Sequence, residues 1–299
     1  MNIAPNEITV SVVMICYNQE QYIAEAIKSV LVQQTKFNVE LIISNDCSTD
    51  NTDGVIGELI DDYKGNINIR YYKQADNLGM KKNFEWALSK IRGEYAAFCE
   101  GDDFWTNPTK LEYQINFLRQ NIDYSLCFHN ANTLYHSGIR NSLTSHIEDR
   151  EYSSNEVLSN WIVPTASVVF RVSALGQEIY HSNVVNGDIV VVLSCGDRGK
   201  IRGMKDCFCS YRMHNQGISE QRILDKKAAF YYAYEKHYIF IKESFRKISP
   251  QVINTKLRDI QLTLFQIRRP SIVSIFHLLK AIYYDHSFFI NRLKKKLFK

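Results

Sequence analysis

The chain has 299 residues, a formal net charge of +4 at pH 7, 45% hydrophobic residues and 23% charged residues. This length allows one large α/β domain with an appendage, and the small net charge argues against nucleic acid as a partner. No apolar run approaches the roughly 18 residues needed to span a bilayer, and residues 1–7 have neither the basic start nor the apolar stretch of a signal peptide. We therefore expect a cytoplasmic protein.

Short apolar runs alternate with helical patterns over the first third of the chain. Residues 10–16 are apolar enough for a buried strand, and residues 21–33 carry apolar side chains at helical spacing. The same alternation continues with strands expected at 39–43, 67–72 and 94–99 and with helices expected around 55–60 and 80–91. Strands and helices that alternate with short loops predict an α/β fold, with a doubly wound, mostly parallel sheet flanked by helices.

The remaining two thirds of the chain are less regular. Pro108 is expected at the first position of a helix. Further strands are expected at 124–130, 166–172 and 205–213, and a helix at 187–197. From about residue 222 the pattern is helical, with breaks at Ser249-Pro250 and Pro270-Ser271. We therefore expect an α/β domain over residues 1–220 and a helical C-terminal extension over residues 221–299.

Three carboxylates gather in the segment Glu100-Gly101-Asp102-Asp103, directly after the apolar run 95–99. The carboxyl end of a buried strand opens at a crevice of the sheet, where ligands bind. Like charges this close repel one another, so the cluster makes sense if a divalent cation occupies the site. Oxygen ligands suit Mg²⁺ or Mn²⁺, which usually share their coordination with substrate phosphates. The alternative is an acidic turn in which Asp102 caps the next helix.

Two other predicted strand ends carry polar residues suited to ligand binding: Tyr17-Asn18 after the first strand and Asn45-Asp46 after the second. A dinucleotide-binding fold would place Gly-x-Gly-x-x-Gly after the first strand, but the segment Tyr17-Asn18-Gln19-Glu20 contains no glycine. A glycine-rich phosphate loop that ends in Lys-Ser/Thr is also absent from the sequence. Bound phosphates must therefore be held mainly by a metal ion.

Five segments carry a family resemblance through their order and spacing. They are Val10 to Asn18, Asp46-x-Ser48-Thr49-Asp50, Asn77-x-Gly79, Gly93-Glu94-Tyr95 and Glu100 to Trp105. Together they resemble the family 2 glycosyltransferases of the GT-A fold over roughly residues 8–220. The resemblance implies an inverting enzyme that moves a sugar from a nucleoside diphosphate donor to an acceptor hydroxyl. It also implies Mn²⁺ or Mg²⁺ as the cofactor and makes residues 1–220 the catalytic domain.

The resemblance assigns roles in donor binding to individual residues. Asp46 would bind the base of the nucleotide. Asp102 and Asp103 would hold the ribose and the diphosphate-bound metal between them. Tyr17 and Asn18, after the first strand, would line the nucleotide-sugar site.

The chain departs from the commonest family pattern at Asn45, Cys47 and Glu100, which stand in place of Asp, Gly and Asp. The first two changes leave the base-binding aspartate intact. Glu100 keeps the negative charge but lengthens the reach to a metal. Lys82, near the start of a predicted helix, is either a positive contact for the donor diphosphate or a solvated helix lysine.

The family's general base is an acidic residue before a helix in the second half of the chain, and Asp188 in Asn186-Gly187-Asp188-Ile189 fits this place. The alternatives are that Asp188 only caps the helix, or that Asp197 is the base. His214 ends the segment Tyr211-Arg212-Met213-His214, which resembles a late family element. It would complete the metal shell or contact the diphosphate, although a lone histidine can also be structural.

The resemblance suggests a UDP-sugar as the default donor and a glycan or lipid-linked acceptor, as in bacterial lipopolysaccharide or other cell-surface polysaccharide synthesis. Residues 272–299 alternate apolar with basic groups and end in a lysine-rich tail. This segment would make a weak contact with the anionic inner leaflet of the plasma membrane, or would pack its apolar side on the catalytic domain.

Two other functions stay open at this point. One is a sugar nucleotidyltransferase on a related fold, which would show a glycine-rich signature after the first strand. The other is a non-catalytic carbohydrate-binding protein that kept the fold. The complete set of candidate site residues argues against the second alternative.

Overall fold

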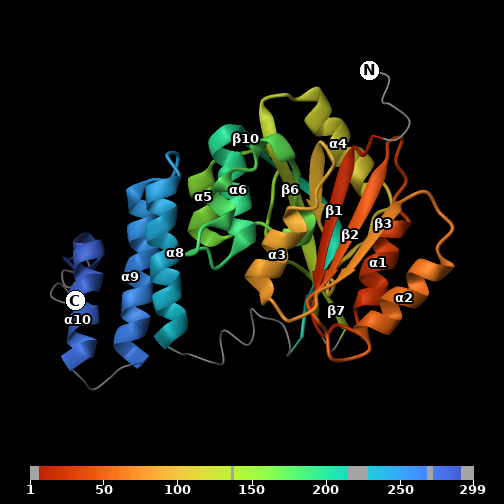
Figure 1. Cartoon of the computed structure of the whole chain (residues 1–299). Helices are drawn as coiled ribbons and strands as arrows, with labels where there is room; N and C mark the ends of the chain where they lie inside the picture. Colours follow the sequence, from red (N-terminus) through yellow and green to blue (C-terminus); the bar gives the residue numbers. More distant parts are fainter. Residues whose placement is uncertain (1–6, 136–137, 215–227, 268–271, 291–299) are drawn as a thin grey trace. The chain divides into compact units, whose positions relative to one another are not determined.

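The computed structural model describes residues 7–135, 138–214, 228–267 and 272–290 (Figure 1). The chain divides into two compact units, one made of Met1–Tyr180 with Asn186–His214 and the other of His181–Val185 with Asn215–Lys299. We call them the sheet unit and the helical unit. The predicted boundary between residues 220 and 221 lies outside the described residues.

The sheet unit is built on one mixed sheet with the strand order β3-β2-β1-β4-β9-β6-β10-β5, to which β7 is added at β6 and β8 at β10. Strands β1 to β4 pair in parallel, and so do β6 and β10, whereas β5, β7, β8 and β9 pair antiparallel. The strands are β1 Val10–Cys16, β2 Val39–Asn45, β3 Asn68–Lys73, β4 Tyr95–Phe98, β5 Phe104–Trp105, β6 Tyr124–Tyr135, β7 Gly138–Leu143, β8 Arg150–Tyr152, β9 Val169–Arg171 and β10 Lys200–Met213.

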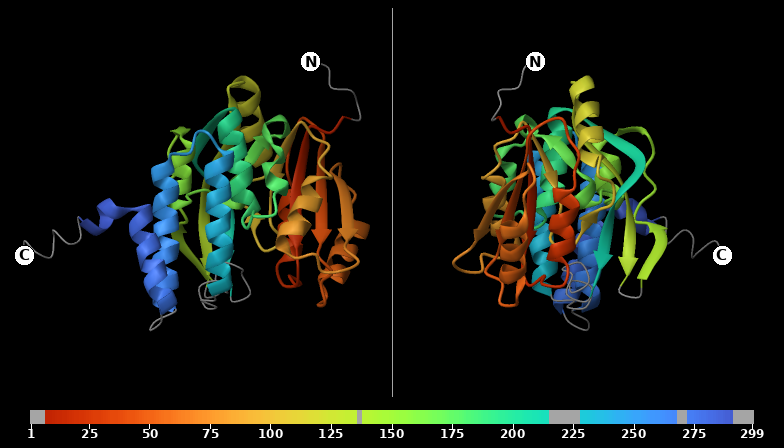
Figure 2. Two further views of the ribbon diagram at one scale, coloured as in Figure 1. Left: turned by 60° about the vertical axis from the view of Figure 1, so that its left-hand side comes forward. Right: turned by 90° about the vertical axis from the view of Figure 1, so that its right-hand side faces the viewer.

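Helices cover both faces of this sheet (Figure 2). Side chains alternate along β1, so that Val12 and Met14 share one core with apolar residues of α1, α2 and α4. On the other face the Phe84 ring of α3 lies 5.3 Å from the ring of Phe98 in β4. The helices are α1 Ile23–Leu31, α2 Thr52–Asp62, α3 Met80–Leu88, α4 Lys110–Gln120, α5 Ser154–Asn160 and α6 Gly187–Arg198. The predicted α/β fold, with a mostly parallel sheet flanked by helices, is confirmed.

Some local predictions are wrong. Helix α4 begins at Lys110 with Thr109 as its N-cap, so Pro108 lies outside the helix and not at its first position. The strand predicted at 166–172 is shortened to β9, because Thr165–Ser167 forms a 3₁₀ turn. In that turn the Ser167 N–H donates to the carbonyl oxygen of Pro164 at 2.9 Å, which removes these residues from strand pairing.

The helical unit contains α8 Ala228–Ser244, α9 Pro250–Ile267 and α10 Ile272–Tyr284. Helix α9 packs against both α8 and α10. The predicted break at Ser249-Pro250 is confirmed, since Pro250 is the first residue of α9. The predicted break at Pro270-Ser271 lies outside the described residues. No helix in the described ranges is long and apolar enough to cross a membrane.

Lys110, the first residue of α4, is fully buried in the sheet unit. Its Nζ lies 4.2 Å from the centroid of the Trp105 ring, and no described residue accepts a hydrogen bond from it. Burial lowers the pKa of this amine to about 8. A charged group that loses its water without gaining a hydrogen-bond partner costs folding free energy.

We predict that Lys110→Met raises the melting temperature at pH 7 and that this gain shrinks toward pH 10. The folded pKa of Lys110 lies below its unfolded value, so the wild-type chain gains stability as pH rises between the two. The expected change is roughly 2 to 3 kcal/mol of unfolding free energy between pH 7 and pH 10. Thermal melts at both pH values measure it, with the exposed Lys205→Met as control. A gain that does not change with pH would contradict the assigned cause.

Candidate active site

The loop after β4 carries the predicted carboxylate cluster and is fastened to the end of β1. The Asp103 N–H donates to the carbonyl oxygen of Glu100 at 3.1 Å, which closes a turn. The Gly101 N–H donates to the carbonyl oxygen of Ile15 at 3.1 Å. A Cβ atom at Gly101 would lie 2.9 Å from the Cβ of Cys16, so this close approach requires glycine.

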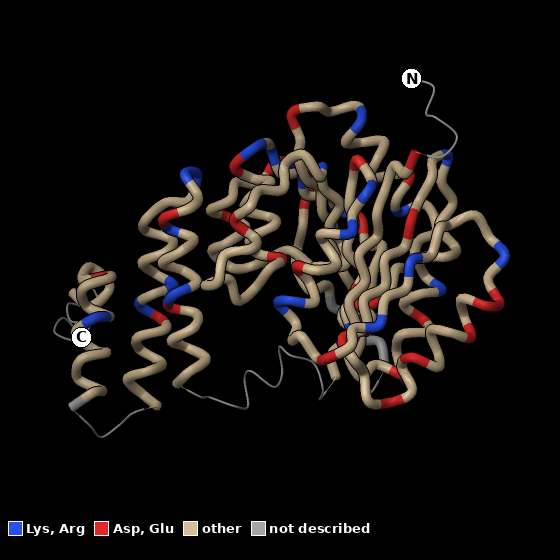
Figure 3. The backbone as a smooth tube through the Cα atoms, viewed as in Figure 1, with Lys and Arg blue, Asp and Glu red and all other residues tan. Residues whose placement is uncertain are grey.

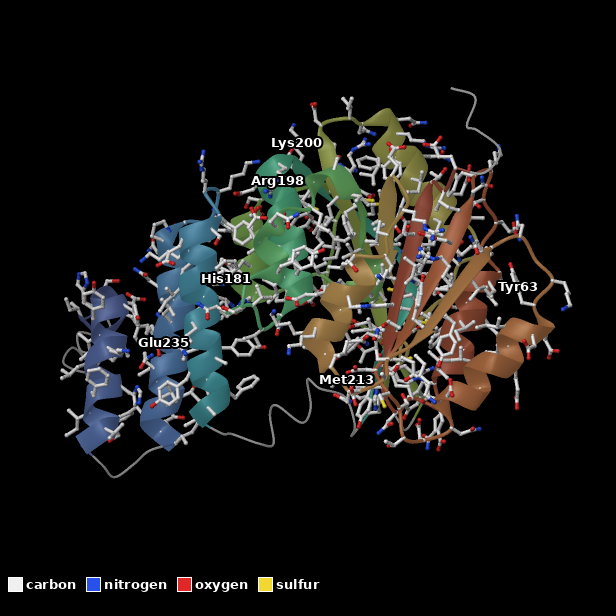
Figure 4. The ribbon with its side chains drawn as sticks, in the orientation of Figure 1. Tyr63, His181, Arg198, Lys200, Met213 and Glu235 are labelled. Carbon is white, nitrogen blue, oxygen red and sulfur yellow. The ribbon has the colours of Figure 1, made fainter. Side chains whose placement is uncertain are left out.

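Asp102 and His214 come together although they are far apart in the sequence. His214 Nε2 lies 3.1 Å from Asp102 Oδ2, and the imidazole is buried while the Asp102 side chain is 24% exposed. The ring of Tyr22, the N-cap of α1, packs 4.6 Å from the imidazole. Figure 4 labels the neighbouring Met213 at the end of the sheet where β1 and β2 also end.

Asp103 has a different environment from Asp102. Its side chain is buried, and its Oδ1 accepts the backbone N–H of Arg212 at 2.9 Å. Burial, followed by the negative charge of Asp102, raises the pKa of Asp103 well above its ordinary value, while Arg212 acts in the opposite direction. In this geometry Asp103 anchors the loop to β10, and Asp102 is the carboxylate beside the imidazole.

The donor atoms of Asp102 and His214 fit a divalent cation. Two neighbouring ligands of an octahedral ion with bonds of about 2.1 Å lie about 3 Å apart, which matches the 3.1 Å between Nε2 and Oδ2. In the part of the chain that the structure describes, no group of three or more His, Cys, Asp or Glu side chains is arranged to hold a metal. A cation on this pair would therefore take its other ligands from phosphate oxygens and water.

Asp46, predicted to bind the base, lies at the end of β2 and braces the loop that leads into α3. Its Oδ1 accepts the Leu78 N–H at 2.7 Å, and its Oδ2 accepts the Gly79 N–H at 3.0 Å. Asn77 Nδ2 donates to the Asp46 carbonyl oxygen at 3.2 Å. Gly79 has a φ of +80°, which a residue with a side chain rarely adopts. The Asn77-x-Gly79 motif thus fixes the orientation of the Asp46 carboxylate.

The other predicted donor-site residues lie on nearby strand ends and on α3. Tyr17 is exposed after β1. The Asn18 Oδ1 accepts the Thr49 N–H at 2.8 Å, so Asn18 ties the loop after β1 to the loop after β2. Lys82 is exposed on α3, whereas the adjacent Lys81 forms an ion pair within that helix.

Asp188 is the second residue of α6 and not its N-cap, which is Asn186. The Thr165 hydroxyl donates to Asp188 Oδ2 at 3.1 Å, and the Ile189 N–H donates to Oδ1 at 2.9 Å. The amino end of a helix favours negative charge. Asp197, the competing candidate, is on the last turn of the same helix.

Two contributors to the site were missed by sequence reasoning. Thr165 holds the Asp188 carboxylate from a turn 23 positions earlier, and Arg212 contacts the Asp102-Asp103 loop. Thr165 has no local motif that marks it. Arg212 stands in the Tyr-Arg-x-His segment that drew attention to His214, so its position could have been singled out, but its partners could not.

The sequence matches the family model described as glycosyl transferase family 2 over residues 11–175. The chain belongs to this family. The resemblance found in its motifs is therefore confirmed, and the matched segment holds Asp46, Asp102 and Asp103.

Related sequences extend this finding. An uncharacterized protein of Mycobacterium tuberculosis is 35% identical over 218 residues, which is 73% of this chain and 62% of that protein. The chain thus spans less than two thirds of that relative. A Bacillus subtilis protein named as a candidate teichuronic acid biosynthesis glycosyltransferase, TuaG, is 28% identical over 216 residues, or 71% of this chain and 82% of that protein.

Solved structures show the same fold at low identity. The crystal structure of S. aureus TarS in complex with UDP-GlcNAc matches with a TM-score of 0.66 and 16% identity, over 92% of this chain and 80% of that one. The mannosyltransferase PcManGT from Pyrobaculum calidifontis, in complex with GDP-Man and Mn²⁺, matches with a TM-score of 0.60 and 13% identity, over 94% and 74% of the two chains. These structures support the GT-A type of the fold.

Proposed function

We propose that the protein is an inverting glycosyltransferase that moves a sugar from a nucleoside diphosphate donor to a hydroxyl of a glycan or lipid-linked acceptor. The observation that carries the proposal is the Asp102–His214 pair, 3.1 Å apart in the unit that also contains Asp46 after β2 and Asp188 in the first turn of α6. The family membership and a relative named for teichuronic acid biosynthesis support a place in bacterial cell-surface polysaccharide synthesis.

Donor binding is proposed for the loops after β1 and β2. Asp46 would accept a hydrogen bond from the base while its carboxylate stays held by the backbone of Leu78 and Gly79. Tyr17, exposed directly after β1, would contact the nucleotide. A UDP-sugar is the default donor, and the TarS complex with UDP-GlcNAc supports a donor of this class. Lys82 would add a positive charge near the diphosphate.

Asp102 and His214 would hold a Mn²⁺ or Mg²⁺ ion, with Asp103 fixing the loop behind them. Such an ion neutralises the charge that grows on the leaving diphosphate. Asp102 is also proposed to contact the ribose. The Mn²⁺ in the PcManGT structure supports a divalent cation for this fold.

Asp188 is proposed to be the general base. Its carboxylate would take the proton of the acceptor hydroxyl while that oxygen attacks the anomeric carbon, and the bond from this carbon to the diphosphate breaks on the opposite side. The Thr165 hydroxyl and the Ile189 N–H each donate to one carboxylate oxygen and so fix its orientation. The first turn of α6 favours the ionised form that a base needs.

We predict that Asp188→Asn keeps donor binding but lowers the transfer rate by about 10²- to 10⁴-fold, because an amide cannot accept the proton. Transfer assays with the wild type and the variant measure the loss, and donor binding is followed by calorimetry. Asp197→Asn, at the other end of α6, is the matched control and should keep full activity. An active Asp188→Asn variant would rule out this base.

We predict that Asp102→Ala abolishes the rise in melting temperature that Mn²⁺ with UDP gives the wild-type protein, because the cation loses one of its two protein ligands. Thermal-shift assays with and without Mn²⁺ test this. Asp206→Ala, an aspartate on the same sheet unit outside the candidate site, is the control. An equal Mn²⁺ effect in Asp102→Ala and the wild type would show that the metal assignment is wrong.

We further propose that the helical unit brings the enzyme to the inner face of the plasma membrane. One side of α10 is exposed and apolar, with exposed fractions from 46% at Val273 to 82% at Tyr283, and Ile275, Phe276 and Leu279 between them. Val273, Phe276, Leu279 and Tyr283 recur at spacings of three and four, and Ile275 lies four positions before Leu279, so they share one side of the helix. Lys280 is the one charged residue of α10. Figure 3 accordingly shows this helix almost entirely in tan.

The charge of the sequence that follows α10 indicates which partner this apolar surface binds. Residues 291–299, outside the described residues, include Arg292 and four lysines and no acidic residue. An apolar stripe followed by basic residues suits an anionic lipid surface, where each basic residue adds about 1 kcal/mol.

We predict that the full chain sediments with vesicles of phosphatidylglycerol and phosphatidylcholine, and that Phe276→Ser with Leu279→Ser weakens this binding about tenfold or more through lost apolar burial. Deletion of residues 290–299 should weaken it as well, and more strongly at low salt. The control is Ile122→Ser, which removes an exposed apolar side chain from the sheet unit. The membrane proposal would be contradicted if both variants bound vesicles as the wild type does. It would also be contradicted if the substitutions abolished dimerisation of the protein and left vesicle binding unchanged.

A further inference from the structure

Arg212 is a nearly buried arginine close to the end of β10, beside Met213 (Figure 4). Its backbone N–H donates to Asp103 Oδ1 at 2.9 Å, and its Nη1 donates to the carbonyl oxygen of Asp102 at 2.7 Å. Its Nη2 forms an ion pair with Glu25 in the first turn of α1. One side chain therefore joins the segments that follow β1 and β4 to the end of β10.

Two aromatic rings hold the guanidinium group in place. Its Cζ lies 4.8 Å from the ring centroid of Tyr22 and 5.0 Å from that of Phe104. Tyr22 also packs against the imidazole of His214. A planar guanidinium can stack on both rings while it donates two hydrogen bonds in fixed directions, and a lysine ammonium cannot do both.

Arg212 contacts Asp102 of the candidate metal pair directly and is linked to His214 through the chain and through the ring of Tyr22. The guanidinium fixes the backbone of Asp102, whose carboxylate faces the imidazole. The backbone of Arg212 fixes the β10 end, and His214 is only two residues farther along the chain. Loss of the Arg212 side chain would free the Asp102 backbone and the ring of Tyr22, while the backbone N–H of residue 212 still holds the β10 end, so the carboxylate would move relative to the imidazole.

We propose that Arg212 is the positioning residue of this pair: it holds Asp102 and His214 at the separation at which one divalent cation binds both. Arg212 acts through these two side chains and needs no contact with the donor. The inference rests on the proposed function, because it requires that Asp102 and His214 bind the cation.

The test measures Mn²⁺ affinity directly, by calorimetry on the full chain in the presence of UDP, for Arg212→Ala, Arg212→Lys and two controls. Arg150→Ala is the matched control, since Arg150 also stacks on a ring, at 3.7 Å from that of Tyr152, and pairs with Glu156 at 2.9 Å. Arg150 lies opposite Gly203 of β10. Gly203 is nine residues from Arg212, which is roughly 30 Å along the strand. Asp102→Ala is the control for the metal site itself.

We expect Arg212→Ala to weaken Mn²⁺ binding by about 10- to 100-fold, as the loss of an outer-shell contact commonly does. Arg212→Lys should retain part of the affinity, and Arg150→Ala should bind as the wild type even if its melting temperature falls equally. If Arg212→Ala and Arg212→Lys both bind Mn²⁺ as tightly as the wild type while Asp102→Ala does not, the positioning role is wrong and the metal site stands. If Asp102→Ala also binds normally, the metal site falls and the role of Arg212 with it.

Discussion

The candidate site depends on how the fold offsets the charge repulsion and the burial of two adjacent aspartate side chains at the end of a buried strand. Asp103 is buried beside Asp102, and both burial and that neighbouring charge raise its pKa. The end of β10 supplies the compensation, with the Arg212 N–H on Asp103 and the His214 imidazole on Asp102. The strand order brings the end of β10 to the acidic loop, because β10 pairs with β5 and β5 directly follows that loop in the chain.

The polar residues of the donor loops have a structural task in the absence of a ligand. Asp46 accepts two backbone N–H groups and Asn18 accepts one, so each loop is fixed before a nucleotide arrives. A carboxylate has about four acceptor positions, so two remain on Asp46 for the contact with a base that we propose. Groups that are already oriented lose less entropy on binding. The same hydrogen bonds that stabilise the loops would therefore also prepare the proposed donor site.

Local pattern was sufficient to predict the parallel strands β1 to β4 and most helices, because apolar periodicity depends on neighbours in sequence. It also placed Asp102, Asp103, Asp188 and His214 at strand or helix ends. It could not separate the anchoring environment of Asp103 from the partly exposed one of Asp102, since that difference arises from the pairing of β10 with a loop 109 positions earlier. The contact of Thr165 with Asp188 could not be predicted either, because it also joins residues that are far apart in the sequence. The position of Pro108 was wrong because the 3.6-residue apolar pattern does not fix the first residue of a helix.

A short turn connects the acidic loop with the proposed base. Trp105, two residues after Asp103, donates its indole N–H to the carbonyl oxygen of Ala166 at 2.8 Å, and the preceding Thr165 donates to Asp188. One packed indole ring thus links the loop of Asp102 and Asp103 to the turn that holds the Asp188 carboxylate. Lys110 lies over that ring without a hydrogen-bond partner among the described residues, at a cost in stability. Marginal stability leaves room for such local costs where the geometry of a site requires them.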